Sequence, residues 1–400
     1  MKKKIGALLV GALGSISTTV ITGVFAKKMG IIDENYLTTE CDPLYKDLDF
    51  VNIQDITFGG WDIVKKDMYS ATKEHKVVNE KLLDAVKDKL ESVVVLPGAA
   101  TVTGNIIDKF IENSVKTSGH RDAVTAIIND IKRFKERHKL DSIIVVNLAS
   151  TEVHISTDKP EYQTLAAFEK ALDENSPAIT FGMLYAYAAL KSGSAYINFT
   201  PSVTVDIPAL MDLAVSLNLP IAGKDGKTGQ TLYKTVIAPM LKERSLKLKG
   251  WYSVNILGNR DGEVLSCAEN LATKIESKKN VLPDIMGYSD FDHQVNINYY
   301  KPRGDAKEAW DNIDFTGWLN EEMSMKINWL GKDSILAAPL VLDLIRWVDF
   351  FQQQGEGGIL TQLSSYFKSP YNTNIHNFFE QVQELRNHVS RKYALGGVNA

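Results

Sequence analysis

The sequence has few residues of the kinds that cross-link a chain or bind zinc. Only two cysteines, Cys41 and Cys267, occur among 400 residues, and the seven histidines are scattered. So few cysteines exclude a disulfide framework of the kind that holds small secreted domains together, and they fit a reducing compartment. The histidines give no His/Cys cluster with zinc-ligand spacing. A hard cation held by phosphate and aspartate oxygens stays open.

The chain also lacks an excess of charge and long apolar runs. Its net charge is -4 without a long run of one sign, so nothing indicates binding to nucleic acid or to an anionic membrane. Beyond residue 26 no apolar run is long enough to span a bilayer. A composition of 44% hydrophobic and 24% charged residues is ordinary for globular proteins. The length allows two domains, or one domain with a large insertion.

The first 28 residues, MKKKIGALLVGALGSISTTVITGVFAKK, allow more than one interpretation. Three lysines, an apolar run and Ala26 have the form of a secretory signal. Alternatively, residues 5–10 form a buried strand, Gly11 and Gly14 a tight turn, and the next residues a helix whose free N–H groups could hold a pyrophosphate. The polar cluster SISTT within the run favours the second interpretation. A strand and helix without any ligand is a third.

Strand and helix patterns alternate through the first half of the chain. We expect strands near residues 49–63, 92–98, 141–152 and 192–202, and helices near 77–90, 121–138, 162–172 and 183–190. This alternation predicts an α/β fold with a Rossmann-like, doubly wound parallel sheet. Ligands of such sheets lie at the carboxyl ends of the strands. Four of those ends are small and polar: residues 11–17, 59–62, 148–151 and 198–202.

After about residue 206 the pattern changes. The stretches LKLKGWYSVNIL and DHQVNINYYKP alternate apolar with polar residues. They predict a second sheet that is open to solvent on one face, with antiparallel pairing as the expected arrangement. Residues 333–355 read as a long apolar helix that packs back on the first sheet, and the glycines from Gly355 to Gly358 end it.

Ten short stretches together resemble inositol-3-phosphate synthase (myo-inositol-1-phosphate synthase). They occur in the family's order and span residues 10 to about 370: VGALGSISTT, FGGWDI, VVNLASTE, YAYAALKSGSAYINFTPS, GKDGKTGQT, SVNILGNRDGEVLS, TKIESKKNV, GDAKEAWDN, DSILAAPLVLDL and SSYFKSP. The size and the glycine turn are more similar to the shorter, archaeal-type branch than to the longer eukaryotic enzymes. The resemblance implies that the N-terminus is retained as a Rossmann strand and that the protein is cytoplasmic.

The resemblance also implies the activity and the domain plan. Members of the family convert D-glucose 6-phosphate to 1D-myo-inositol 3-phosphate with NAD as a resident cofactor. The route is oxidation at C5, enolisation at C6, aldol closure from C6 to C1, and reduction at C5; it opens inositol and inositol-lipid biosynthesis. We expect an NAD-binding Rossmann domain at 1–205, completed by 310–400. An inserted α+β catalytic and tetramerisation domain would occupy 206–309, and homotetramers are implied.

Four lysines match the lysines of the family's motifs. We expect them to surround O1, O5 and the phosphate of the substrate: Lys274, Lys278, Lys307 and Lys368. Lys368 is the candidate for proton transfer at O5, because a desolvated lysine beside other cations can serve as acid or base. If their segment is helical, the i, i+4 spacing puts Lys274 and Lys278 on one face, and a solvated charged face is the ordinary alternative. Replacing Lys274 or Lys368 by alanine should then abolish turnover with little loss of fold.

Further residues match the family's active site. Asp225, Asn255, Asp261 and Asp333 are the expected catalytic partners, although Asp333 could simply cap a helix. Residues expected to bind the substrate phosphate, at the start of a helix, are Lys227, Thr228, Gly229 and Gln230; a capped helix without a ligand is the alternative. Residues expected to bind the cofactor are Gly11, Ala12, Gly14, Ile16, Ser17, Thr18, Asp62, Ala149, Ser150, Thr151, Thr200, Pro201, Gly223, Asp225, Asp261 and Asp333. Asp62 would bind a ribose hydroxyl, or serve only as a turn residue.

Two segments depart from the family's pattern. The GLGGNNGST loop becomes GALGSISTT, which puts the grip on the pyrophosphate in doubt, and Lys224 replaces the first aspartate of GDDxKSGQT. Archaeal-type members use a divalent ion, so a divalent cation of unknown identity is implied as a second cofactor. Two other functions remain as alternatives. One is an NAD(P)-dependent sugar-phosphate dehydrogenase without the aldol step. The other is an exported structural protein.

Overall fold

The computed structural model describes residues 3–33, 36–99, 111–153, 155–258 and 281–393. Within them the larger sheet has seven strands, all parallel, in the order β11-β6-β5-β4-β1-β2-β3. The strands are β1 (Ile5–Val10), β2 (Ile56–Asp62), β3 (Val95–Pro97), β4 (Ser142–Asn147), β5 (Ala195–Asn198), β6 (Pro220–Gly223) and β11 (Gly358–Ile359). This is the doubly wound order of dinucleotide-binding folds with an added edge strand. Its switch point lies between β1 and β4.

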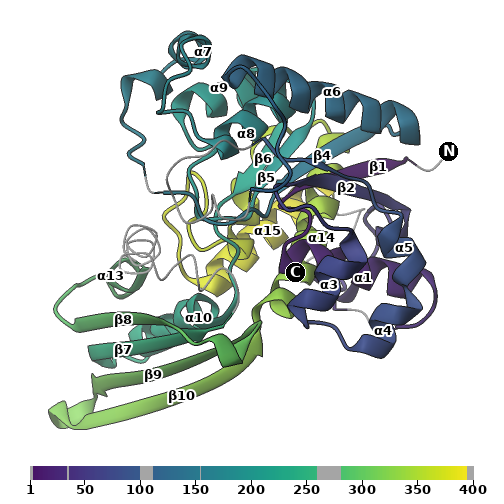
Figure 1. Ribbon diagram of the computed structural model, residues 1–400. Coiled ribbons are helices and arrows are strands. Elements are labelled where there is room, and N and C mark those ends of the chain that lie inside the picture. The colour runs from purple at the N-terminus through teal and green to yellow at the C-terminus, as the bar shows by residue number, and fades with distance from the viewer. Residues whose placement is uncertain (1–2, 34–35, 100–110, 154, 259–280, 394–400) are drawn as a thin grey trace.

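Helices cover both faces of this sheet (Figure 1). One core cluster joins the sheet to α1 (Ser15–Lys28), α3 (Met68–His75), α4 (Glu80–Ala85), α5 (Lys87–Glu91), α14 (Asp333–Gln353) and α15 (Phe378–Tyr393). The other joins it to α6 (His120–His138), α7 (Leu165–Asp173), α8 (Phe181–Lys191) and α9 (Pro208–Ser216). Covering on both faces explains why the central strands are apolar throughout. Short helical turns lie between elements of this layer: α2 (Thr38–Cys41), η1 (Ile53–Asp55), η3 (Pro160–Tyr162) and η6 (Thr361–Tyr366); η4 (Lys301–Arg303) and η5 (Trp318–Asn320) lie between strands of a second sheet.

The N-terminal segment is the strand, glycine turn and helix of the second interpretation. Residues 5–10 form the middle strand β1, which pairs with β2 on one side and β4 on the other, and every one of them is buried. The polar residues of the SISTT cluster begin α1, where Ser17 and Thr18 are fully buried. No helix in the described part of the chain is long and apolar enough to cross a membrane.

A second sheet lies apart from the first (Figure 1). Its order is β10-β9-β7-β8, formed by β7 (Lys247–Leu257), β8 (Asp292–Tyr299), β9 (Ala306–Thr316) and β10 (Glu322–Lys332). Helices α10 (Gly229–Glu243) and α13 (Val281–Met286) share a hydrophobic cluster with one face, and Tyr252 and Leu330 are exposed on the other. The expectation of antiparallel pairing holds for β9 with β7 and β10, but β7 and β8 are parallel. Parallel strands need a long connection, and β7 ends at Leu257 while β8 begins only at Asp292.

Several sequence-based boundaries differ from the structure. The helix expected at 77–90 is two short helices, because Asn79 caps α4 through the Leu82 N–H (2.8 Å) and the chain turns again at Val86. Helix α3 was not expected. Strand β6 joins the first sheet although it follows residue 205, and β10 joins the second although it follows residue 309. The proposed domain limits therefore do not follow the division into sheets.

Candidate active site

The turn between β1 and α1 has the geometry of a dinucleotide-binding turn. Gly11 has a φ of +81°, and a Cβ on it would stand 3.0 Å from the Cα of Ala149 at the end of β4. Gly14 is the N-cap of α1, with no side chain to occupy the first N–H groups of the helix. Ser17 donates its hydroxyl to the carbonyl of Gly11 (2.7 Å) and thereby holds the turn against the helix. An anion fits at such an uncapped helix start, so these residues suit a pyrophosphate.

Leu13, which stands where the family's turn has a glycine, is held by hydrogen bonds at both its N–H and its carbonyl. The Leu13 N–H donates to Asp62 Oδ2 (2.7 Å), and the Leu13 carbonyl accepts a hydrogen bond from His75 Nε2 (2.7 Å). The other oxygen of Asp62 accepts from the Val64 N–H (2.9 Å). Carboxylate oxygens have spare lone pairs, so a ribose hydroxyl can still bind Asp62. His75 at the end of α3 was not predicted, because a lone histidine carries no motif.

Gly11→Ala is expected to lower both NAD affinity and stability. An alanine at a left-handed φ costs about 1–2 kcal/mol, and here its Cβ would also press on the Ala149 backbone. Gly30→Ala is the matched control, since Gly30 has a φ of +67° with open space around it. Titration with NAD and thermal unfolding should show a larger stability loss for Gly11→Ala, and at least tenfold weaker NAD binding for that variant alone. Equal effects of both substitutions would contradict the close approach.

The strand ends connect this turn to the predicted catalytic residues. After β4, the Ala149 N–H donates to Asn147 Oδ1 (3.2 Å). Asn147 in turn donates to Asn198 at the end of β5 (3.4 Å). After β6, the Asp225 N–H donates to the Thr200 carbonyl (3.0 Å). The carboxyl edge of the sheet thus places the expected cofactor residues in one row, as doubly wound folds do.

Lys368 and Asp225 form a buried ion pair at this edge. The Lys368 ammonium is 2.6 Å from Asp225 Oδ1, and their side chains are only 9% and 7% exposed. A backbone bond from the Lys368 N–H to the Asp225 carbonyl (2.6 Å) fixes the two segments against each other. The sequence predicted both residues as catalytic, and the fold brings them together across 143 positions. Such a pair holds a fixed positive charge in a site with little water.

Lys227 is a second buried lysine of the same loop. Its ammonium donates to Gln381 Oε1 of α15 and lies 5.7 Å from the centre of the Phe378 ring. Burial, and to a lesser extent the positive charge of Lys368, lower the pKa of Lys227 from 10.5 to about 7. Gln381 is fully buried and its Nε2 donates to the Ile375 carbonyl (2.6 Å), which orients its oxygen toward Lys227. Sequence analysis missed Gln381, because helix α15 carries no recognised motif.

Lys227→Met is expected to stabilise the ligand-free protein at neutral pH. Below about pH 7 Lys227 is charged in the folded and the unfolded protein, so folding carries the full free-energy cost of burying the charge. Between pH 7 and 10.5 only the unfolded protein keeps the extra proton, and this cost falls as the pH rises. At about 1.4 kcal/mol for each pH unit the gain is on the order of 5 kcal/mol at most, less the lost bond to Gln381. Unfolding free energies at pH 6.5 and 9.5 should differ from wild type by more at pH 6.5. An equal difference at both would contradict the shift.

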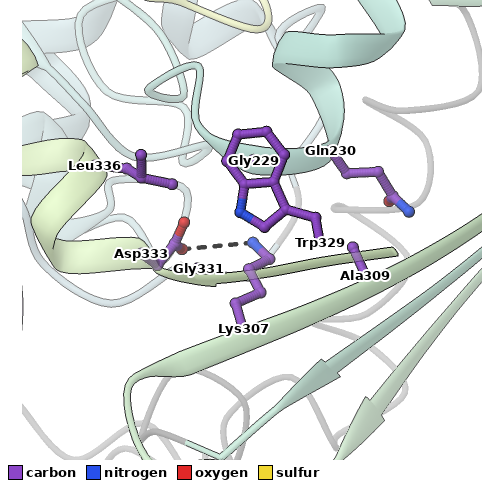
Figure 2. A pocket seen from close by; sticks show the side chains of 8 residues that line it. All are labelled: Gly229, Gln230, Lys307, Ala309, Trp329, Gly331, Asp333 and Leu336. Atoms are coloured by element: carbon purple, nitrogen blue, oxygen red, sulfur yellow. Dashed lines mark hydrogen bonds and ion pairs between the residues drawn. The ribbon is translucent and has the colours of Figure 1, made fainter. Parts of the chain in front are cut away.

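A pocket lies between strands β9 and β10 of the second sheet and helices α10 and α14 (Figure 2). It is lined by Gly229 and Gln230 of α10, Lys307 and Ala309 of β9, Trp329 and Gly331 of β10, and Asp333 and Leu336 of α14. The Lys307 ammonium is 3.4 Å from Asp333 Oδ2, and the other Asp333 oxygen accepts from the Thr228 hydroxyl (2.9 Å). Asp333 is the first residue of α14, and Lys332 is its N-cap, so the alternative of an ordinary N-cap at Asp333 is wrong.

The structure brings together most of the predicted site residues that it describes. Asn255 lies on β7 and donates to Gln230 Oε1 (2.5 Å) beside the pocket. Lys224, which replaces an aspartate of the family's motif, forms an ion pair with Asp206, with its ammonium 2.6 Å from Oδ2. Asp261, Lys274 and Lys278 lie outside the described residues. Among the residues that are described, no group of three or more His, Cys, Asp or Glu side chains is placed to hold a metal ion.

The doubly wound parallel sheet and its glycine turn define a fold of the dinucleotide-binding class. An NAD-binding family model described as myo-inositol-1-phosphate synthase matches residues 37–390. An inositol-3-phosphate synthase of Bacteroides thetaiotaomicron is 40% identical over 97% of this chain and 96% of its own. That of Saccharomyces cerevisiae is 30% identical over 87% and 74%. The chain belongs to the myo-inositol-1-phosphate synthase family.

Solved structures agree in fold. The crystal structure of inositol-3-phosphate synthase from Caenorhabditis elegans superposes with a TM-score of 0.90 at 23% identity, covering 100% of this chain and 90% of the other. A myo-inositol-1-phosphate synthase-related protein from Thermotoga maritima gives 0.77 at 23% identity, covering 96% and 98%. The resemblance found in the sequence is therefore confirmed at the level of the family, while the archaeal-type branch stays a prediction.

Proposed function

We propose that this chain converts D-glucose 6-phosphate to 1D-myo-inositol 3-phosphate, with NAD as a resident cofactor. The observation that carries the proposal is the buried Lys368–Asp225 pair at the carboxyl edge of the dinucleotide-binding sheet. A fixed cation there can stabilise an oxyanion on a sugar carbon held against that edge. Family membership and the 40% identical synthase support the choice of substrate.

The proposed roles follow from where each residue lies. When bound, NAD supplies a hydride acceptor and donor. Lys368 exchanges the proton of the C5 hydroxyl, and Asp225 holds its ammonium in place. Lys307, held by Asp333, faces the second developing oxyanion from the pocket. Lys274 and Lys278 are proposed partners of these groups on the strength of the family motif.

The substrate phosphate is proposed to bind at the start of α10. Lys227, Thr228, Gly229 and Gln230 precede or begin this helix, whose N-terminus favours an anion. A phosphate there would also restore the charged form of the buried Lys227, because an opposite charge favours the ammonium. Among the described residues no group of three or more His, Cys, Asp or Glu side chains is placed to hold a metal ion, so a divalent cation would bind substrate oxygens together with a carboxylate such as Asp333.

The proposal is tested by incubating the purified protein with glucose 6-phosphate and catalytic NAD, with and without a divalent ion. Phosphorus NMR identifies the product, and absorbance follows NADH. Inositol phosphate without NADH accumulation is the expected result. Stoichiometric NADH with a keto-sugar product would instead support the sugar-phosphate dehydrogenase. No turnover with any ion would overturn both and point to the altered GALGSISTT turn.

Assembly and location are also proposed. The face of the second sheet that α10 and α13 leave uncovered carries exposed Tyr252, Trp310 and Leu330, and the hairpin between β9 and β10 ends in exposed Trp318 and Leu319. Exposed apolar surface of this kind marks protein contacts, in line with the homotetramer implied by the family. A cytoplasmic location is in keeping with the scarcity of cysteine.

A further inference from the structure

The carboxylate of Asp311, on β9, is enclosed by hydrogen-bond donors. Its Oδ1 accepts from the Trp251 indole (2.6 Å) and the Ser253 hydroxyl (2.6 Å). Its Oδ2 accepts from Gln230 Nε2 (2.8 Å) and from the Tyr233 hydroxyl. Burial and the Asp311 charge raise the pKa of Tyr233 far above its usual range, so the phenol remains a donor. Asp311 is 3% exposed, and all its bonds come from α10 and β7.

This carboxylate fixes the orientation of the Gln230 side-chain amide and, through it, that of the Asn255 side-chain amide. An ionised carboxylate only accepts, so the NH₂ group of Gln230 must face Asp311 and its oxygen must face away. That oxygen then accepts from Asn255 Nδ2 (2.5 Å), so the NH₂ group of Asn255 must face Gln230. Asn255 Oδ1 is left buried, with no hydrogen-bond partner among the residues described. The amide assignments follow from the network and are not arbitrary.

We propose that Asp311, through Gln230, is a positioning residue that makes Asn255 present a carbonyl oxygen, rather than an NH₂ group, to the active site. A buried amide oxygen without a partner is unfavourable unless a ligand satisfies it. The ligand it selects is a hydrogen-bond donor: a sugar hydroxyl of the substrate or a catalytic ammonium. This inference rests on the proposed function, because it assigns a role within that site.

Asp311→Asn inverts the network without changing its shape. The new amide must direct its oxygen to the Trp251 indole, which can only donate, and hence its NH₂ group to Gln230 and to Tyr233, whose hydroxyl can turn to accept. Gln230 then has to turn, Asn255 has to turn after it, and an NH₂ group faces the site. Adding Gln230→Glu reverses this, because a carboxylate at position 230 accepts from both neighbours and returns Asn255 to its original orientation.

The experiment measures kcat/KM and thermal unfolding for wild type, Asp311→Asn, Gln230→Glu and the double variant, with Ser253→Ala as control. We expect Asp311→Asn to lower kcat/KM on the order of 100-fold. The double variant places a carboxylate at Gln230, a proposed phosphate-binding residue, so its recovery is read from thermal unfolding, while Ser253→Ala should keep kcat/KM within a few-fold of wild type. Gln230→Glu alone places two carboxylates together, so it should also be impaired.

The outcomes separate this inference from the proposed function. Asp311→Asn with wild-type kcat/KM would overturn the inference. In thermal unfolding, both single variants should melt below the double variant; a double variant that melts lowest would overturn it as well. The comparison of melting temperatures needs no turnover, so it still tests the inference if the wild type forms no inositol phosphate. That result would count against the proposed function alone.

Discussion

Lys368→Met is expected to lower kcat by a factor on the order of 10³ and to destabilise the protein. The factor is that of losing a positioned proton carrier, for which 10²–10⁴ is typical. The destabilisation, about 3–5 kcal/mol, arises because Asp225 would remain as an unpaired carboxylate with a side chain only 7% exposed. Turnover with saturating glucose 6-phosphate and NAD, together with thermal unfolding, measures both effects.

A second variant separates the two effects. In Asp225→Asn/Lys368→Met no buried charge is left unpaired, so most of the stability should return while the activity should not. Stability and activity that recover together would mean that the pair only holds the loop to the sheet. Sequence analysis alone led us to expect little loss of fold on replacing Lys368. The buried pair changes this expectation, because a charge can be removed without penalty only where water or a partner compensates the remaining one.

Lys307→Met is expected to lower kcat/KM on the order of 10²–10³-fold with little change in stability. Lys307 lines the pocket and its ion pair with Asp333 is partly exposed, at 15% and 26% for the two side chains. Partly exposed pairs contribute about 0–1 kcal/mol, so the fold should tolerate the change. Steady-state kinetics and thermal unfolding of the purified variant provide the test.

Lys326→Met is the matched control for this prediction. Lys326 lies on the neighbouring strand β10, paired in register with Asn312, and it is exposed. Its removal changes the net charge of the protein by the same amount but touches no pocket residue. We expect wild-type kinetics. Should both variants lose activity alike, a general electrostatic attraction of the anionic substrate would replace the specific role of Lys307.

Structural features that depend on neighbouring residues were predicted well from the sequence, and features that depend on interrupting or very short segments were not. Helices 121–138 and 333–355 were predicted nearly to the residue, because their periodic apolar positions are a local property. The helix expected at 77–90 was wrong in its continuity, because Asn79 and Val86 interrupt it. Strand β6 was missed, because its four residues begin with Pro220 and end with Gly223, two residue types that favour a turn.

The candidate site divides in the same way. Lys368, Asp225, Lys307 and Asp333 were named from motifs, but the motifs gave no pairing. Which lysine meets which carboxylate is decided by contacts across 143 and 26 positions. Gln381 and His75 carry no motif and were missed. Asp311 could have been found, because alternation along β9 puts it on the same face as Lys307 and Ala309.

The sequence by itself determined the Rossmann-like order of elements, the glycine turn and the family, because these depend on local residue types and on motifs in a fixed order. Only the tertiary structure decided which charges are buried, which are paired, and how the amides of Gln230 and Asn255 are oriented. The physical reason is that burial and hydrogen-bond direction are set jointly by β7, β9 and α10, and no segment of the chain contains that information alone.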